Sequence, residues 1–163
     1  MAEVKFEDNS VQVKNAIEDQ CIQWLYEVAG EIRSQAQRNS RVDTGQLKGS
    51  WDYRVDEGDK EATIGSALEN AIWEEFGTGE YAVKQGRSGY WVYVKGSGNT
   101  KSSSPKSYSL EGAKQAVAML RSKGLDAHYT KGKKPNRTLE RAFTTVKPKA
   151  QAAAEKLLKG GLK

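Results

Sequence analysis

The chain has one cysteine, Cys21, and one histidine, His128, among its 163 residues. A single cysteine cannot form a disulfide within the chain, and one cysteine with one histidine does not make the set of about four ligands that holds structural zinc. These scarcities exclude a disulfide-stapled secreted domain and a zinc-built fold. They indicate a reducing, cytoplasmic setting.

Long apolar runs are also missing. No stretch approaches the roughly 18 apolar residues of a membrane span, and the N-terminal residues carry acids where a signal peptide has its apolar core. We therefore expect a soluble protein that is not secreted. A chain of this length is predicted to be a single domain, residues 1–163, that buries a core without staples.

Charge is present in abundance and is unevenly divided. Residues 1–94 carry ten Lys and Arg against seventeen Asp and Glu, a net charge of −7, whereas residues 95–163 carry sixteen against four, a net charge of +12. Such a division suits copies that pack acidic side to basic side, or a basic part that faces nucleic acid. A Lys-rich face that only meets solvent is the equally weighted alternative.

Groups that could carry catalysis are few. Asp43-Thr44-Gly45 matches the triplet of aspartic proteases, but those enzymes need a buried symmetric pair of carboxylates, and polar residues surround this triplet. Glu74 and Glu75 point about 100° apart on a helix and are expected to be surface charges. His128 and Cys21 are interpreted as an ordinary surface or half-buried residue and a core residue. No enzyme is predicted.

Hydrophobic spacing predicts helices and strands in alternation. Apolar residues recur at three- and four-residue intervals from Val11 to about residue 38, which indicates a long amphipathic helix. Alternation in residues 51–55 and 62–65 around a turn indicates a β-hairpin. The run 90–94 is rich in aromatic and β-branched residues and predicts a strand. Residues 128–130 are a short strand or a connection.

Three further helices are expected, at residues 68–76, at about 109–123, and from near Pro135 to the end. Proline suits the first position of a helix, whereas Pro148 should kink or restart the last one. Residues 96–106 have the composition of a flexible loop. The predicted fold class is α+β, with a small antiparallel sheet of three to four strands packed against the long N-terminal helix and the C-terminal helix.

Three short segments follow one another along the chain. They are Asp43-Thr44-Gly45-Gln46-Leu47-Lys48-Gly49-Ser50, Glu75-Phe76-Gly77-Thr78, and Lys134-Pro135. Their order and spacing resemble the neck, or head-tail joining, family of long-tailed bacteriophages. In that family an Asp-Thr-Gly-x-Leu-x-x-Ser element precedes a Glu-Phe-Gly-Thr turn and a terminal helix led by Lys-Pro.

The resemblance implies a small α+β subunit of a ring, six- or twelve-fold, in the virion neck between the DNA-filled head and the tail. The implied partners are head-closure or connector proteins and tail-tube or tail-terminator proteins, with no catalysis and no cofactor. Tail-completion and tail-terminator subunits share this architecture, so the layer of the neck stays open. Because connecting segments often carry binding surfaces, the expected subunit contacts are Asp43, Thr44, Gly45, Leu47, Glu75, Phe76, Gly77 and Thr78.

The chain departs from the family pattern in two places. Residues 96–130 form a longer stretch with a helix of its own, and Asn136-Arg137 stands where an apolar-aromatic pair commonly follows Lys-Pro.

The alternative function is a small cytoplasmic protein that binds DNA without sequence preference through the basic segment 129–149. Phosphate contacts need only positive charge and reach, and no base-reading motif accompanies the segment. A neck ring would also gain from weak contact with the genome in its channel. A solvated basic loop is the equally weighted alternative. The DNA-facing candidates are Lys131, Lys133, Lys134, Arg137 and Arg141.

Overall fold

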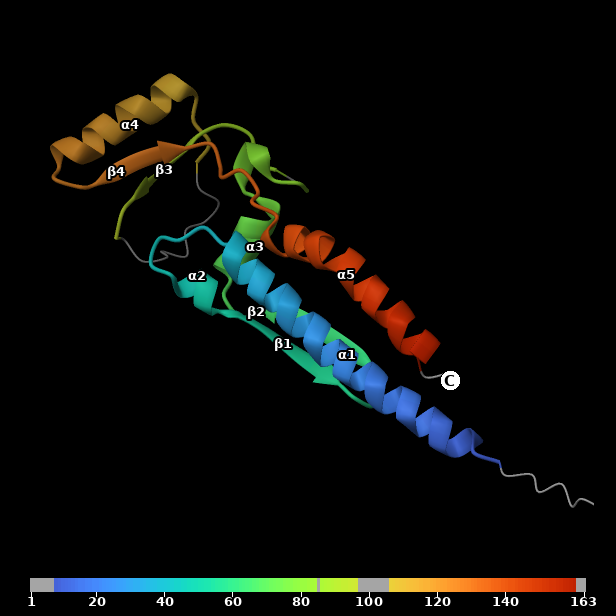
Figure 1. Ribbon diagram of the computed structural model, residues 1–163. Coiled ribbons are helices and arrows are strands. Elements are labelled where there is room, and N and C mark those ends of the chain that lie inside the picture. Colours follow the sequence, from blue (N-terminus) through green and yellow to red (C-terminus); the bar gives the residue numbers. More distant parts are fainter. Residues whose placement is uncertain (1–7, 85, 97–105, 161–163) are drawn as a thin grey trace, which may run out of the picture. The chain divides into compact units, whose positions relative to one another are not determined.

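The computed structural model describes residues 8–84, 86–96 and 106–160. The chain is α+β, as predicted, and it divides into two compact units (Figure 1). Unit 1 combines Met1–Leu68 with Thr138–Lys163, and unit 2 is Glu69–Arg137. Unit 2 is thus an insertion between the early and late parts of unit 1. The flexible loop expected at about 96–106 lies almost wholly outside the described residues.

Unit 1 is built on the long N-terminal helix α1, Ser10–Asn39, which packs on a β-hairpin and along the C-terminal helix α5, Thr138–Gly160 (Figure 1). The hairpin strands are β1, Trp51–Asp56, and β2, Glu61–Ser66, in antiparallel register from Trp51 opposite Ser66 to Asp56 opposite Glu61. A short helix, α2, Gln46–Gly49, precedes the hairpin. Both predicted terminal helices are confirmed.

Small side chains let α1 and α5 approach closely in unit 1. The buried residues of this core are Ala29, Ile32 and Ala36 of α1, Trp51 of β1, and Ala142, Val146 and Ala150 of α5. The two helices run antiparallel, because Asn39 at the end of α1 donates to the carbonyl oxygen of Thr138 at 3.3 Å, while Trp24 donates to that of Ala150 at 3.1 Å.

Of the kink or restart expected at Pro148, the restart does not occur, since α5 is one helix from Thr138 to Gly160. A proline inside a helix removes one hydrogen bond and costs about 3 kcal/mol. Val146 and Ala150 are buried on either side of Pro148, and the indole of Trp24 holds the Ala150 carbonyl. Tertiary packing therefore offsets the local preference to break the helix.

Unit 2 contains helix α3, Asn70–Phe76, a 3₁₀ turn η1, Gly79–Tyr81, strand β3, Trp91–Val94, helix α4, Leu110–Ser122, and strand β4, Ala127–Thr130. The strands pair antiparallel, from Trp91 opposite Thr130 to Val94 opposite Ala127. Helix α4 packs on both strands and buries Ala113 and Val117.

The predicted single sheet of three to four strands is wrong. The described residues form two sheets of two strands each, β1 with β2 in unit 1 and β3 with β4 in unit 2. Each pair packs against a helix of its own unit, α1 for the first and α4 for the second. Alternating apolar residues predict that a strand exists and has a buried face, but they do not name the strand that pairs with it.

Candidate functional site

The first of the three sequence segments forms an exposed turn in unit 1. Asp43 and Thr44 are exposed, and Gly45 has a φ of 80°, a left-handed backbone conformation that glycine adopts without steric cost. The turn is anchored by Leu47, which is buried on α2. The structure thus presents two polar side chains on a fixed turn, and their expected role in subunit contact stays a prediction.

The second and third segments lie side by side in unit 2, in what we call the clasp, residues 77–81 and 130–135. The amide of Thr78 donates to the carbonyl oxygen of Lys133 at 2.9 Å, and the amide of Lys133 donates back to Thr78 Oγ1 at 3.0 Å. One turn further, the amide of Glu80 donates to the carbonyl oxygen of Lys131 at 2.9 Å. Segments more than 50 residues apart in sequence are therefore joined backbone to backbone.

Three glycines permit the close approach in the clasp, namely Gly77, Gly79 and Gly132, and a Cβ atom on Gly132 would overlap the carbonyl oxygen of Thr78. Gly77 has a φ of 71°, and a Cβ atom there would lie 2.7 Å from the Lys133 carbonyl oxygen and 2.8 Å from Pro135 Cδ. Gly79 has a φ of 62°, and a Cβ atom there would overlap the Lys131 carbonyl oxygen. A side chain at any of these three positions would push the two segments apart. This gives the Gly-Thr-Gly sequence a structural reason.

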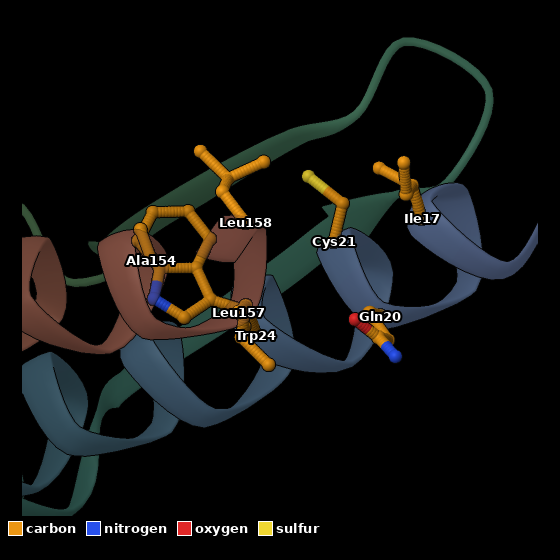
Figure 2. Close-up of a pocket in the computed structure, with 7 residues that line it drawn as sticks. All are labelled: Ile17, Gln20, Cys21, Trp24, Ala154, Leu157 and Leu158. Carbon is orange, nitrogen blue, oxygen red and sulfur yellow. The ribbon is translucent and has the colours of Figure 1, made fainter. Parts of the chain in front are cut away.

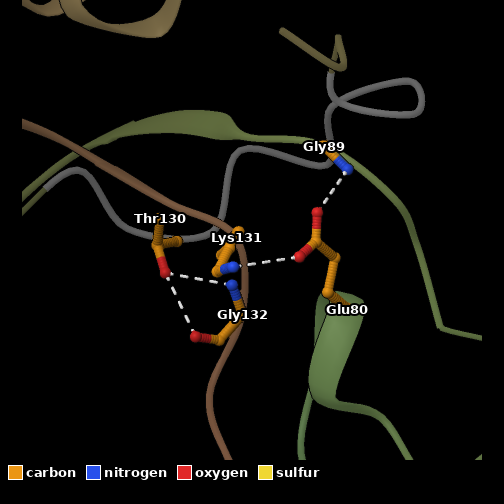
Figure 3. Close-up of polar contacts among 5 residues, drawn as sticks. All are labelled: Glu80, Gly89, Thr130, Lys131 and Gly132. Carbon is orange, nitrogen blue, oxygen red and sulfur yellow. Dashed lines mark hydrogen bonds and ion pairs between the residues drawn. The ribbon is translucent and has the colours of Figure 1, made fainter. Parts of the chain in front are cut away.

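Charged groups hold the outer end of the clasp, where Figure 3 shows the carboxylate of Glu80 between two donors. Its Oε1 accepts from the Gly89 amide at 3.2 Å, and its Oε2 lies 3.2 Å from Lys131 Nζ. The amide hydrogen bond from Gly89, together with the Lys131 ammonium, lowers the pKa of Glu80 below its ordinary value. Conversely, the hydrogen bond to Glu80 raises the pKa of Lys131.

The inner end of the clasp is held by Glu74, which is only 5% exposed and forms an ion pair with the Lys133 ammonium. Its carbonyl oxygen accepts from the amides of Asn136 at 2.6 Å and Arg137 at 3.3 Å. The expectation that Glu74 is a surface charge is wrong. No local signal could have shown this, because its ammonium partner lies 59 residues later.

Helix α3 consequently exposes apolar side chains. Its buried positions are Ala71 and Glu74, whereas Ile72, Trp73 and Phe76 are 60%, 48% and 53% exposed. Phe76, a predicted contact residue, thus lies on an exposed apolar face, and Glu75 next to it is half-buried.

The clasp also changes where the last helix begins. Pro135 packs on Gly77 within the clasp, and Asn136 and Arg137 donate their amides to Glu74, so α5 starts at Thr138 and the prediction of a start near Pro135 is wrong. A proline at a helix start is only a preference. Here the backbone hydrogen bonds of the clasp prevail.

The basic candidates fall in two places. In the clasp, Lys131 pairs with Glu80 and Lys133 with Glu74, and the Lys131 and Lys134 ammonium groups lie 5.3 Å and 5.6 Å from the centre of the Tyr81 ring. Arg137 ends unit 2, and Arg141 is exposed on the first turn of α5 in unit 1. The clasp lysines serve the local structure, and their contact with DNA stays a prediction.

Other candidate groups lie apart from the clasp. His128 lies on β4, its Nε2 is 2.8 Å from Oδ1 of Asp126, which precedes the strand, and its ring stacks on that of Tyr93. Cys21 is half-buried on α1 of unit 1. Within residues 8–84, 86–96 and 106–160, no group of three or more His, Cys, Asp or Glu side chains could hold a metal ion. Over the same residues, no helix is both long and apolar enough to cross a membrane.

Comparison with known proteins gives one family. Residues 5–94 match the model of the HK97-gp10-like family, which is described as "Bacteriophage HK97-gp10, putative tail-component". The matched range contains α1, the hairpin, α3, the first segment of the clasp (residues 77–81) and β3, and it confirms the resemblance to phage proteins that the sequence motifs indicate. No curated protein and no solved structure matches the chain.

Proposed function

Since the chain belongs to the HK97-gp10-like family of bacteriophage tail components, we propose that it is a structural virion protein that forms a ring in the neck and joins the DNA-filled head to the tail. The observation that carries the proposal is the family match over α1, the hairpin and the turn at Glu75–Thr78. The turn at Glu75–Thr78 ends in the clasp, which fixes its backbone. On this proposal the protein is not an enzyme and needs no cofactor.

The ring is a homo-oligomer of six or twelve copies between head-closure or connector proteins and tail-tube or tail-terminator proteins. Two features support a role in assembly. The exposed turn at Asp43 and Thr44 is anchored by the buried Leu47, and the clasp fixes the backbone beside the exposed Phe76. Surfaces that are held rigid before binding lose less entropy when a partner docks.

Contact with the genome is a second proposal, carried by the basic residues of the clasp and of α5. Lys133 and Lys134 are exposed, as is Arg141. The acids that pair with Lys131 and Lys133 reduce the net positive charge there. The expected contact is therefore weak and independent of DNA sequence, as suits DNA that must move through a ring.

The test is cryo-electron microscopy of particles from cells in which the gene is intact or deleted. The proposal expects deletion to leave filled heads and separate tails, and it expects the intact particle to carry this subunit as a ring between them. Heads and tails that join normally without the protein would refute the neck role, and DNA binding would then be tested as the main function.

A further inference from the structure

The β-hairpin of unit 1 is a sheet of two strands, so each strand has an outer edge that the other strand does not reach. Among residues 8–84, 86–96 and 106–160, no further strand pairs with β1 or β2. Over the same residues, one hydrogen bond from outside the ladder reaches the backbone of these strands, from Arg33 Nε to the Trp51 carbonyl oxygen at 3.0 Å. The two edges therefore keep outward amides and carbonyl groups that a further strand can bind.

Neither strand carries the usual devices that prevent edge pairing, which are proline, lysine, a bulge or a charge that points inward. The two strands contain no proline and no lysine, and their register is unbroken over six pairs. The side chains that alternate toward α1 are all uncharged, namely Trp51, Tyr53, Val55, Ala62, Ile64 and Ser66.

The sheet of unit 2 differs, because short segments flank both of its strands. Tyr90, just before β3, exchanges two backbone hydrogen bonds with Tyr108, at 2.9 Å and 2.7 Å. Lys131, just after β4, accepts a hydrogen bond from the Glu80 amide in the clasp. In the part of the chain that the structure describes, the hairpin of unit 1 has no such flanking segment.

The hairpin is held in place on α1. Figure 2, centred on an apolar pocket between α1 and α5, also shows the green hairpin behind the helices, with its turn near Ile17. In this turn Lys60 Nζ lies 3.5 Å from Glu18 Oε1, and Glu57 Oε1 accepts from the hydroxyl of Tyr26 at 2.9 Å. Edges that are fixed before binding lose less entropy when a strand is added.

The inner face of the hairpin is only partly covered. Trp51 is buried, whereas Tyr53 and Val55 of β1 and Ala62 and Ile64 of β2 are half-buried. A strand added at either edge would remove part of this apolar surface from water, which favours the addition.

The outer face of the hairpin carries two opposite charges that have no ion pair within the described residues, Arg54 of β1 and Glu61 of β2, and both are exposed. The other acids of this face have partners. Asp52 lies 3.9 Å from Arg33 Nε, and Asp56 accepts from two amides of the turn at 3.0 Å. Within the hairpin, Glu61 stands opposite Asp56, a like charge that disfavours the pair.

Antiparallel pairing of β2 with β1 of a second copy brings these two charges together. Because side chains alternate between faces, the register between copies can shift only in steps of two residues. The register found within the chain would put Glu61 opposite Asp56 again. A shift of two residues puts Glu61 opposite Arg54 on the outer face and Ala62 opposite Tyr53 on the inner face. Both faces then match.

We propose that β2 of one copy adds to β1 of the next copy, with Glu61 opposite Arg54, so that the hairpins form one continuous antiparallel sheet around the ring. The contact joins two different edges, so it is heterologous and repeats when the rotation closes. One kind of contact then satisfies both free edges, whereas self-pairing of β1 would leave β2 unpaired. The proposal rests on the ring proposed above and names the edges that build it.

The test exchanges the two charges. In cells whose phage lacks the gene, plasmids supply Arg54→Glu, Glu61→Arg, or both variants together as separate chains. Mass spectrometry measures the amount of the protein in purified particles. The matched controls, Lys14→Glu and Glu27→Arg, reverse two exposed charges of α1 in the same unit.

Each single variant places like charges at every contact between copies, so we expect its incorporation to fall at least tenfold relative to its matched control. Supplied together, the two variants can alternate around a ring of six or twelve copies with opposite charges at every contact, so incorporation should recover. Neither chain in this mixture has opposite charges at both positions, so recovery cannot come from pairing within one copy, and it also shows that both variants fold.

Other results would overturn the proposal. A loss with Arg54→Glu alone would indicate that β1 pairs with itself about a two-fold axis, with Arg54 opposite Asp52. Losses in both single variants without recovery in the mixture would indicate that the hairpin binds a strand of another virion protein. Incorporation of both single variants at the level of their controls would refute the strand pairing and leave the neck role standing. Absence of the unmodified protein from the particles would refute both proposals.

Discussion

The indole nitrogen of Trp24 donates a hydrogen bond to the carbonyl oxygen of Ala150 at 3.1 Å. The two residues are 126 positions apart, and the acceptor lies two residues beyond Pro148 in α5. This contact joins the first helix to the last one within one turn of the proline.

Replacing Trp24 by Phe removes this donor and keeps an aromatic ring. We expect unit 1 to lose about 1 kcal/mol of its free energy of unfolding, the typical net contribution of one hydrogen bond. Urea denaturation followed by circular dichroism measures the loss. Trp73→Phe is the matched control, since Trp73 is 48% exposed, and an equal loss in both variants would contradict the argument.

Replacing Gly77 by Ala should open the clasp. The backbone of Gly77, with a φ of 71° and a ψ of −179°, costs a non-glycine residue about 1–3 kcal/mol, and the overlap with Lys133 and Pro135 adds about 1–3 kcal/mol. Gly124→Ala is the control for a positive φ without overlap, because Gly124 has a φ of 79° and open space around its Cα. Hydrogen exchange of the Thr78 and Glu80 amides should accelerate in the first variant only; protection unchanged in both would refute the proposed overlap.

Acid should release the outer end of the clasp. The Gly89 amide and the Lys131 ammonium hold the pKa of Glu80 below its ordinary value of 4.5, so the stabilisation by Glu80 is present above pH 4.5 and is lost as the pH falls through the lowered value. The NMR shift of the Gly89 amide should therefore titrate with a midpoint below pH 4.5. Glu80→Gln should abolish the titration, and a midpoint above 4.5 would contradict the assignment.

High pH should also weaken the ion pair of Glu80 and Lys131, because it removes the proton from Lys131. The hydrogen bond to Glu80 raises the pKa of Lys131, so its stabilisation is complete below its ordinary value of 10.5 and is lost as the pH rises through the raised value. Lys131→Gln should leave the Gly89 amide bound to Glu80 and raise the Glu80 midpoint only in part, because the amide is the larger cause of the lowered pKa.

Genome contact predicts a salt-dependent affinity for any duplex DNA. Neutralising Lys134 and Arg141 to Gln should weaken binding and reduce the slope of log affinity against log salt by about two. Lys133 is left in place because it pairs with the buried Glu74. The control, Lys114→Gln with Lys123→Gln, removes two exposed charges of unit 2 at and beside α4. Fluorescence anisotropy measures both, and equal slopes would contradict contact through the basic segment.

The elements of the fold could largely be predicted from the sequence. Periodicity places the long helix within one residue at each end, since the expected range from Val11 to residue 38 became Ser10–Asn39. The hairpin likewise follows from alternation between Trp51 and Gly65. These are local signals, because a helix or hairpin repeats its pattern over neighbouring residues.

Pairing between distant segments could not be predicted. The partner of β3 lies beyond α4 and those of Gly77 and Glu74 lie beyond residue 130, and nothing near these residues in sequence indicates them. The charge of Glu74 pointed to solvent, but burial depends on whether a partner is within reach. The motif segments can be recognised in the sequence, whereas their joining into one clasp depends on contacts between residues more than 50 positions apart.

The clasp ties together the two ends of unit 2, at Thr78 and Lys133. The chain between these ends is therefore a closed loop, in which doubling the length costs only about 0.6 kcal/mol of closure entropy. Insertions and deletions between the two ends can be absorbed without disturbing the junction. The residues between the two clasp segments can therefore be exchanged, provided that Gly77, Gly79 and Glu74 still hold the two segments together.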